Sequence, residues 1–185
     1  MSLADEPDPF LFTSEAVLLI DKAGVFGERF VELVEGKILR RVTKKPGRAM
    51  MIGIIVKLLN DYCDDSWHVR CHCPLELSEY SLPVPDISIV SGKIRDYIDH
   101  HPRAASLVLE IAESVLEFLR QTKSKLYSTA GVQEYWIVNL CDNQVEVYRQ
   151  PTSNGYAEKF IAKAGEKLSP LVLPEAQIAV DDLLP

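Results

Sequence analysis

The fold is organised around residues 106–139, SLVLEIAESVLEFLRQTKSKLYSTAGVQEYWIVN. This stretch begins with the nearly continuous apolar run Leu107–Ala112, which is typical of a strand buried on both faces. The segment Glu113–Ala130 carries an apolar stripe at helical spacing and is expected to end at Gly131, because glycine is favoured just past a helix end. A second apolar run, Gln133–Asn139, predicts another strand. We therefore expect a strand, a helix and a strand in succession.

Two carboxylates lie at the ends of apolar strands. Glu110 follows the first apolar residues of its strand, and Asp86 begins the predicted strand Asp86–Val90 directly after Pro85. An acid in a buried strand is unfavourable unless it pairs with a cation or holds a metal. The helix after Glu110 carries Lys123, which could lean back over the strand ends, and Tyr127 lies four residues later on the same helical face.

These residue types suit the hydrolysis of phosphodiester bonds with a divalent metal. Asp86 and Glu110 are the candidate ligands, because Mg²⁺ and Mn²⁺ prefer oxygen, and the carbonyl of Ile111 could add a neutral ligand. Lys123, with Lys125 in reserve, could orient the water or stabilise transition-state charge. Spacing alone leaves another interpretation open, since aspartate after proline is common in turns and a strand glutamate can simply pair with a basic residue.

Composition is that of an ordinary globular protein. The chain has 185 residues, 47% hydrophobic and 25% charged, which is enough for one domain with a sizeable core. We expect a flexible acidic segment over residues 1–12 and a single domain over residues 13–185. The N-terminus lacks a basic signal-peptide start, and no apolar run approaches the roughly 18 residues of a membrane helix. We therefore expect a cytoplasmic protein without a membrane partner.

The net charge of −7 argues against a protein that coats nucleic acid non-specifically, because broad phosphate binding requires a basic surface. It does not exclude a nuclease. Active-site acids are anions that await cations, and a local basic patch can exist on an acidic protein.

The remaining segments predict a mixed α/β domain with one sheet flanked by helices. The expected elements are helices at Glu15–Ala23 and Arg48–Cys63, a hairpin at Phe30–Val42 that turns at Glu35-Gly36, and strands at Trp67–Leu77, Gln144–Arg149 and Ala157–Ala162. Within the hairpin, Glu32 alternates with Val31 and Leu33 and so lies on the opposite face. Alternation alone favours a solvated role for Glu32.

Cys71, His72 and Cys73, with Cys63 and His68 nearby, allow a zinc-stabilised domain as a further alternative. A regular strand would place Cys71 and Cys73 on one face and His72 on the other, so the three could not converge without a bulge. Buried free cysteines are the simpler interpretation.

Several segments resemble the Uma-two family of endonucleases, which belongs to the restriction-endonuclease-like PD-(D/E)xK superfamily. These segments are PDISIV at 85–90, LVLEIAES at 107–114 and KSKLYSTAGVQEYWIVN at 123–139, and FVELVEGKIL at 30–39 is similar to the early hairpin of the family. The most specific part is the run K-x-x-x-Y-x-x-x-G-V-x-E-Y-W-x-V. The resemblance covers roughly residues 13–150 and weakens toward the C-terminus.

This resemblance implies a restriction-endonuclease-like fold, with an N-terminal helix and hairpin, and an endonuclease that uses Mg²⁺ or Mn²⁺ on nucleic acid, with DNA expected. Such enzymes often act as homodimers. By resemblance, Asp86 and Glu110 bind the metal and Glu32 supports the metal or its water. The usual lysine two residues after the second acid is replaced by Ala112, and Lys123 is expected to take its place.

Two positions depart from the family pattern. Leu119 stands where an acidic residue is common, and Arg48-Ala49-Met50 stands where a histidine often starts the helix after the hairpin. Together with the acidic net charge, these departures favour a second hypothesis, in which a catalytically inactive nuclease fold serves as a binding or assembly module.

Overall fold

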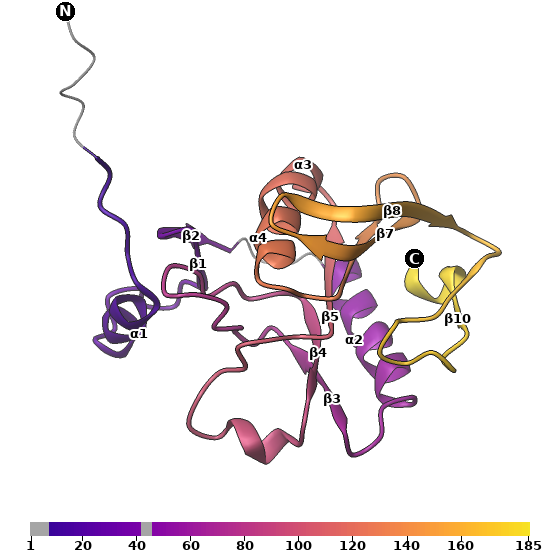
Figure 1. The fold of residues 1–185 in the computed structure, drawn as a ribbon, viewed down its shortest axis with the longest axis horizontal. Coiled ribbons are helices and arrows are strands. Elements are labelled where there is room, and N and C mark those ends of the chain that lie inside the picture. Colours follow the sequence, from indigo (N-terminus) through magenta and orange to yellow (C-terminus); the bar gives the residue numbers. More distant parts are fainter. Residues whose placement is uncertain (1–7, 42–45) are drawn as a thin grey trace, which may run out of the picture.

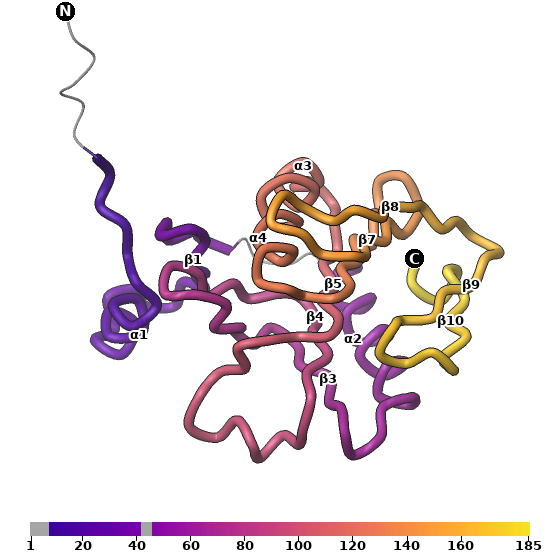
Figure 2. Tube along the Cα trace, in the orientation of Figure 1, coloured from indigo at the N-terminus to yellow at the C-terminus, as the bar shows by residue number. Residues whose placement is uncertain are grey.

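The structure, a computed structural model, describes residues 8–41 and 46–185 (Figures 1 and 2). Its main element is a six-stranded sheet in the order β3-β4-β5-β6-β7-β8. Neighbouring strands run antiparallel, except that β5 and β6 are parallel. The strands are Trp67–Cys71 (β3), Ile87–Ser91 (β4), Leu107–Ala112 (β5), Glu134–Asn139 (β6), Gln144–Thr152 (β7) and Gly155–Lys163 (β8).

Helices cover both faces of this sheet, as the sequence predicts. The helix α2 (Pro46–Asn60) packs on one face, where Ile55 and Leu59 join a core with the odd-numbered residues of β5. The other face is covered by α3 (Leu116–Phe118), the π-helical turn η2 (Leu119–Lys123) and α4 (Ser124–Thr129). Side chains alternate along a strand, so Glu110 faces the second of these layers.

Three short elements follow the sheet at the C-terminal end: β9 (Lys167–Leu168), β10 (Ile178–Ala179) and the 3₁₀ helix η3 (Val180–Leu183). Val180 and Leu183 pack into the core on the α2 side. A further 3₁₀ helix, η1 (Ile94–Tyr97), lies between β4 and β5.

The predicted strand–helix–strand unit is confirmed, with one interruption. β5 has the predicted bounds, and β6 begins one residue later than expected. The helical segment begins at Leu116 rather than Glu113 and contains the π-helical turn in its middle. Gly131 follows the helix with φ of +76°, a conformation that glycine adopts without strain.

The N-terminal part consists of α1 (Ser14–Lys22), whose first turn is capped by Thr13, and the hairpin β1 (Val31–Val34) and β2 (Lys37–Arg40). The hairpin turns where predicted, and both turn residues have positive φ, 48° at Glu35 and 76° at Gly36, as in a type I′ turn. A bridge between Leu33 and Leu82 joins the hairpin to the segment that leads into β4. The predicted hairpin end at Val42 lies outside the described residues.

The predicted strand Trp67–Leu77 is too long, because β3 ends at Cys71. His72 has φ of +51°, which is incompatible with an extended strand and turns the chain out of the sheet. Alternation therefore does not continue through Cys73. Cys63, Cys71, Cys73 and Cys141 all have free thiols rather than disulfides.

The predicted segment 1–12 lies partly outside the described residues, which begin at residue 8. Residues 8–12 form no helix or strand, although Phe12 N–H donates to the carbonyl of Gly36 at 2.9 Å. The division of the chain at residue 13 stays a prediction. Among the helices that the structure describes, none has the length and apolarity needed to cross a membrane.

Candidate active site

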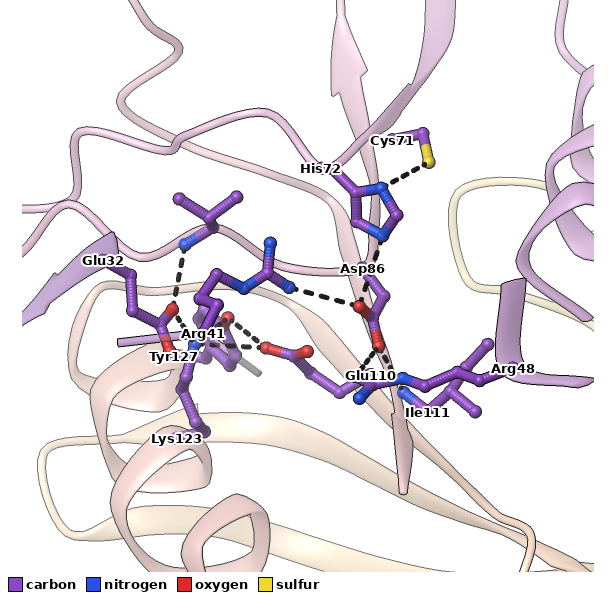
Figure 3. Close-up of polar contacts among 11 residues, drawn as sticks. Glu32, Arg41, Arg48, Cys71, His72, Asp86, Glu110, Ile111, Lys123 and Tyr127 are labelled. Carbon is purple, nitrogen blue, oxygen red and sulfur yellow. Dashed lines mark hydrogen bonds and ion pairs between the residues drawn. The ribbon is translucent and has the colours of Figure 1, made fainter. Parts of the chain in front are cut away.

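Lys123 lies at the centre of a buried polar cluster (Figure 3). Its Nζ donates to Glu32 Oε2 at 2.6 Å and to Glu110 Oε1 at 3.2 Å, and only 2% of its side chain is exposed. The Tyr127 hydroxyl accepts from Lys123 Nζ at 3.4 Å and donates to the same Glu110 oxygen at 2.9 Å. The structure thus brings together three predicted site residues from the hairpin, β5 and the helix, and Tyr127 stands on the helical face where the i, i+4 spacing placed it.

Lys123 is the last residue of the π-helical turn η2. Arg120 in the same turn is anchored to β7, since its Nε and Nη2 donate to Glu146 Oε2 and Oε1 at 2.9 and 2.6 Å. Leu119, which opens the turn, is buried in the core between helix and sheet. π turns are rare and occur frequently at functional sites. The sequence pattern does not predict this turn, because apolar spacing is compatible with a helix that carries one extra residue.

Glu32 is buried, so the solvated role that alternation alone favoured is wrong. It is 8% exposed, and its Oε2 accepts from the backbone N–H of Val84 at 3.1 Å as well as from Lys123. Alternation correctly places Glu32 opposite Leu33. The face on which it lies is covered by protein instead of water.

Asp86 is fully buried and is surrounded by basic groups. Its Oδ2 accepts from Arg48 Nη2 at 2.6 Å and from the backbone N–H of Ile111 at 2.9 Å. Its Oδ1 accepts from Arg41 Nη2 at 3.2 Å and lies 3.5 Å from His72 Nε2. The positive φ of His72 that ends β3 therefore also directs its ring toward Asp86.

The β4–β5 register brings Asp86 to Glu110. Ile87 pairs with Leu109, so Asp86, which directly precedes β4, lies opposite Glu110, which is inside β5 rather than at its end. Figure 3 shows both carboxylates within one group of side chains, in which Glu110 points toward Lys123 and Asp86 toward the arginines. The two predicted acids are therefore neighbours and do not lie on opposite sides of the sheet.

Burial and oppositely charged neighbours have opposite effects on the pKa values of Glu110 and Lys123. Burial raises the pKa of Glu110, and Asp86 and Glu32 add to this rise, whereas Lys123 lowers it. Burial alone would lower the pKa of Lys123, but the carboxylates of Glu110 and Glu32 outweigh this and raise it. Burial and the Glu110 charge raise the pKa of Tyr127 well above its usual value. At neutral pH, Lys123 is therefore a cation and Tyr127 a neutral donor.

The acids have the chemistry of ligands for a hard divalent cation, which binds through oxygen. Asp86, just before β4, and Glu110, inside the adjacent strand β5, would supply these oxygens. Their oxygens here contact basic and polar groups of the chain, and residues 8–41 and 46–185 contain no group of three or more His, Cys, Asp or Glu arranged to hold a metal. Oxygen is nevertheless the donor type that Mg²⁺ and Mn²⁺ prefer. The same finding covers the cysteine–histidine segment at 71–73, where a zinc group is likewise not formed.

Among the residues that the structure describes, Arg41, Arg48 and His72 contact Asp86 and were not predicted as site residues. Arg41 and Arg48 are 45 and 38 residues from Asp86 in the chain, so no local spacing links them to it. The one available signal was the cost of a buried carboxylate, which requires partners without naming them.

Comparisons with known proteins identify the family and the fold of the chain. Residues 26–181 match the family model Uma2, described as "Putative restriction endonuclease". A solved structure described as a "putative nuclease belonging to DUF820" from Anabaena variabilis superposes with a TM-score of 0.69 at 18% identity, over 83% of this chain and 88% of that one. This likeness shows that the restriction-endonuclease-like fold prediction is correct. Curated proteins gave no match. Because the family model spans most of the chain, the protein belongs to the Uma2 family of restriction-endonuclease-like proteins.

Proposed function

We propose that this protein is an endonuclease that hydrolyses phosphodiester bonds in nucleic acid, with DNA as the expected substrate and Mg²⁺ or Mn²⁺ as the required ion. One observation carries the proposal: the Nζ of the buried Lys123 lies 3.2 Å from Glu110 Oε1, and Glu110 lies opposite Asp86 where β4 pairs with β5. Family membership supports a nuclease-type hydrolase.

Each residue has a proposed role. A divalent cation bound by Asp86 and Glu110 would activate water and neutralise charge on the phosphate. Lys123 would present its ammonium to the attacking water or to a phosphate oxygen. Glu32 holds that ammonium by its 2.6 Å bond, and Tyr127 fixes the Glu110 carboxylate through its hydroxyl.

The position of Lys123 accounts for the missing superfamily lysine. Ala112 shares the face of Glu110 on β5, is completely buried, and carries no polar group. Lys123 reaches Glu110 from the covering helix instead. An ammonium group is thereby supplied to the second acid by a different element of the fold.

Assembly and location follow as further proposals. A homodimer would present one site to each strand of a duplex, and the sequence also suggests a cytoplasmic protein. Light scattering of the purified protein, with and without a DNA duplex, would test this assembly. A homodimer predicts a protein mass of twice the monomer mass of 20.8 kDa.

A second candidate function is a non-catalytic binding or assembly module. It is favoured by the ion pairs of the acids, because among the described residues Lys123 pairs with Glu32 and Glu110, and Arg41 and Arg48 pair with Asp86. Carboxylates that are already paired with cations have less electrostatic need of a metal. Calorimetric titration with Mn²⁺ separates the two functions, since only the nuclease requires binding that Asp86→Asn removes.

Cleavage assays test the proposal directly. Supercoiled plasmid and single-stranded DNA would be incubated with the protein in Mg²⁺, Mn²⁺ or EDTA. Asp86→Asn and Lys123→Met should each lower the rate by about a hundredfold or more. Lys125→Met is the matched control, because Lys125 is exposed two residues further along the same helix. Metal-dependent cleavage that survives Asp86→Asn, or equal losses in Lys123→Met and Lys125→Met, would contradict the assignment.

A further inference from the structure

Asp86 and its two arginines differ sharply in their access to solvent. The Asp86 side chain is completely buried, whereas the side chains of Arg41 and Arg48 keep 16% and 18% of their surface exposed. The carboxylate is thus paired with two arginines whose side chains keep some contact with solvent. A ligand that arrives from solvent at this end of the sheet meets the arginines before the acid.

The two arginines use only part of their hydrogen-bonding capacity on Asp86. Each donates to the carboxylate through Nη2, and Arg48 Nε is buried without a hydrogen-bond partner among the described residues. A guanidinium carries five N–H donors. By contrast, Arg120 grips Glu146 with both Nε and Nη2. The arginines on Asp86 therefore retain donors for another acceptor.

Charge identifies the acceptor. Arg41 and Arg48 neutralise Asp86, and a divalent cation on the same carboxylate would leave their positive charge uncompensated. A phosphodiester is an anion whose oxygens match the planar guanidinium fork. The guanidinium groups that the cation displaces from Asp86 are therefore suited to bind a phosphate of the substrate.

We propose that Arg41 and Arg48 exchange partners, holding Asp86 in the ion-free protein and binding a backbone phosphate of the nucleic acid once Asp86 takes a divalent cation. This inference rests on the proposed function and adds substrate-binding residues and a form of regulation to it. Both events break the same ion pairs between Asp86 and the two arginines, so whichever ligand binds first removes that cost for the other. Ion binding and nucleic-acid binding therefore strengthen each other, and by linkage the factor is the same in both directions.

Binding to a fluorescent oligonucleotide tests the exchange without any cleavage. Anisotropy would be measured in EDTA and in Ca²⁺ at constant ionic strength, because phosphate binding depends steeply on salt. In EDTA, Asp86→Asn frees the arginines and should bind about tenfold tighter than the unaltered protein, the gain expected for charged phosphate contacts. The triple variant Asp86→Asn, Arg41→Gln, Arg48→Gln should lose that gain.

Substituting an arginine while Asp86 is retained gives the complementary test. Arg48→Gln should leave affinity in EDTA nearly unchanged and should lower the affinity in Ca²⁺ by about tenfold. Arg103→Gln is the matched control, since this exposed arginine pairs with Glu76 rather than Asp86. Asp65→Asn, at an exposed surface pair with Lys93, controls for the loss of one negative charge. Circular dichroism at the assay temperature checks that each variant is folded.

The outcomes separate this inference from the proposed function. If Asp86→Asn gains no affinity over Asp65→Asn in EDTA, or if the triple variant keeps the gain, the arginine exchange is wrong even where cleavage depends on Asp86. If the gain appears and the arginines account for it, the exchange stands, and absence of cleavage by the unaltered protein in Mg²⁺ or Mn²⁺ then overturns only the catalytic proposal.

Discussion

Glu110 and Glu146 occupy one cross-strand row of the sheet, separated by a single residue. Glu110 pairs with Ile137 on β6, and Ile137 pairs with Glu146 on β7. The same π-helical turn supplies a cation to each acid, with Arg120 on Glu146 and Lys123 on Glu110. Two glutamates with nearly the same position in the fold thus have different partners. Glu146 has the contacts of a structural anchor, whereas Glu110 has those of a candidate catalytic acid.

Glu146 is held by a complete set of donors. Arg120 binds it through two nitrogen atoms, and Asn139 Nδ2 and the Tyr148 hydroxyl each donate to it at 2.9 Å. Burial alone would raise the pKa of Glu146, but these hydrogen bonds outweigh burial and lower it. The arrangement is that of a structural anchor, which ties the π turn to the sheet.

Glu110 accepts fewer hydrogen bonds than Glu146 and is slightly more buried. Its Oε1 receives one ammonium and one hydroxyl, and burial raises the pKa of the carboxyl despite the nearby lysine. Strongly perturbed acids beside a specific cation are typical of functional sites. The anchor at Glu146 ties the π turn to the sheet, and Lys123, at the end of the same turn, contacts Glu110.

Removing the site lysine should have the largest effect on stability. Lys123→Met leaves Glu110 and Glu32 buried without their cation and should lower the free energy of unfolding by about 3–5 kcal/mol. Urea denaturation at pH 7, followed by circular dichroism, measures this. Adding Glu32→Gln to Lys123→Met should recover part of the loss, and Lys125→Met should lose almost nothing. A stability of Lys123→Met equal to that of Lys125→Met would show that the cluster is not a buried ion pair.

Weakening the anchor should have a smaller effect on stability and a specific effect on the site. Arg120→Lys keeps the charge and loses the two-nitrogen grip, which should lower stability by about 1–2 kcal/mol because Arg120 is partly exposed. If Arg120 positions Lys123, the cleavage rate of the variant at saturating DNA should fall about tenfold with little change in KM. A variant that loses stability while its rate at saturation is unchanged would limit Arg120 to a structural role.

The pH dependence of the anchor should be the smallest effect. The folded pKa of Glu146 is lowered, so its stabilising contribution is present above the unfolded pKa, about 4.3, and is lost as pH falls through the folded pKa. Arg120 and Tyr148 face this carboxylate, and Asp142 reaches it through Asn139. Glu146→Gln should therefore flatten the part of the rise in stability that lies below the unfolded pKa. An unchanged pH profile in this variant would show that Glu146 is not held as an anion.

Much of the fold followed from local sequence patterns. The apolar run at Leu107–Ala112 gave β5 with its bounds, and the Glu35-Gly36 pair gave the hairpin turn, because strand burial and turn conformation depend on neighbouring residues. The spacing of Lys123 and Tyr127 likewise predicted a shared helical face, and the contact between their polar atoms confirms it.

The features that escaped prediction depend on contacts between distant segments. Nothing near Asp86 in sequence identifies Arg41 and Arg48 as its partners. The π turn follows from how Arg120 reaches Glu146, 26 residues away, and the early end of β3 follows from the positive φ of His72. Such features arise from tertiary packing, which periodicity in the sequence does not encode.

The two glutamates of the row also provide the most direct test of the catalytic assignment. Plasmid nicking in Mn²⁺ would be compared for Glu110→Gln and Glu146→Gln, at a temperature where both are folded by circular dichroism. The proposed site predicts that Glu110→Gln lowers the rate by about a hundredfold or more, while Glu146→Gln, which loses only the anchor, retains activity within about tenfold. Nicking by Glu110→Gln at the rate of the unaltered protein, or an equal loss in both variants, would contradict the placement of the active site at Glu110, Asp86 and Lys123.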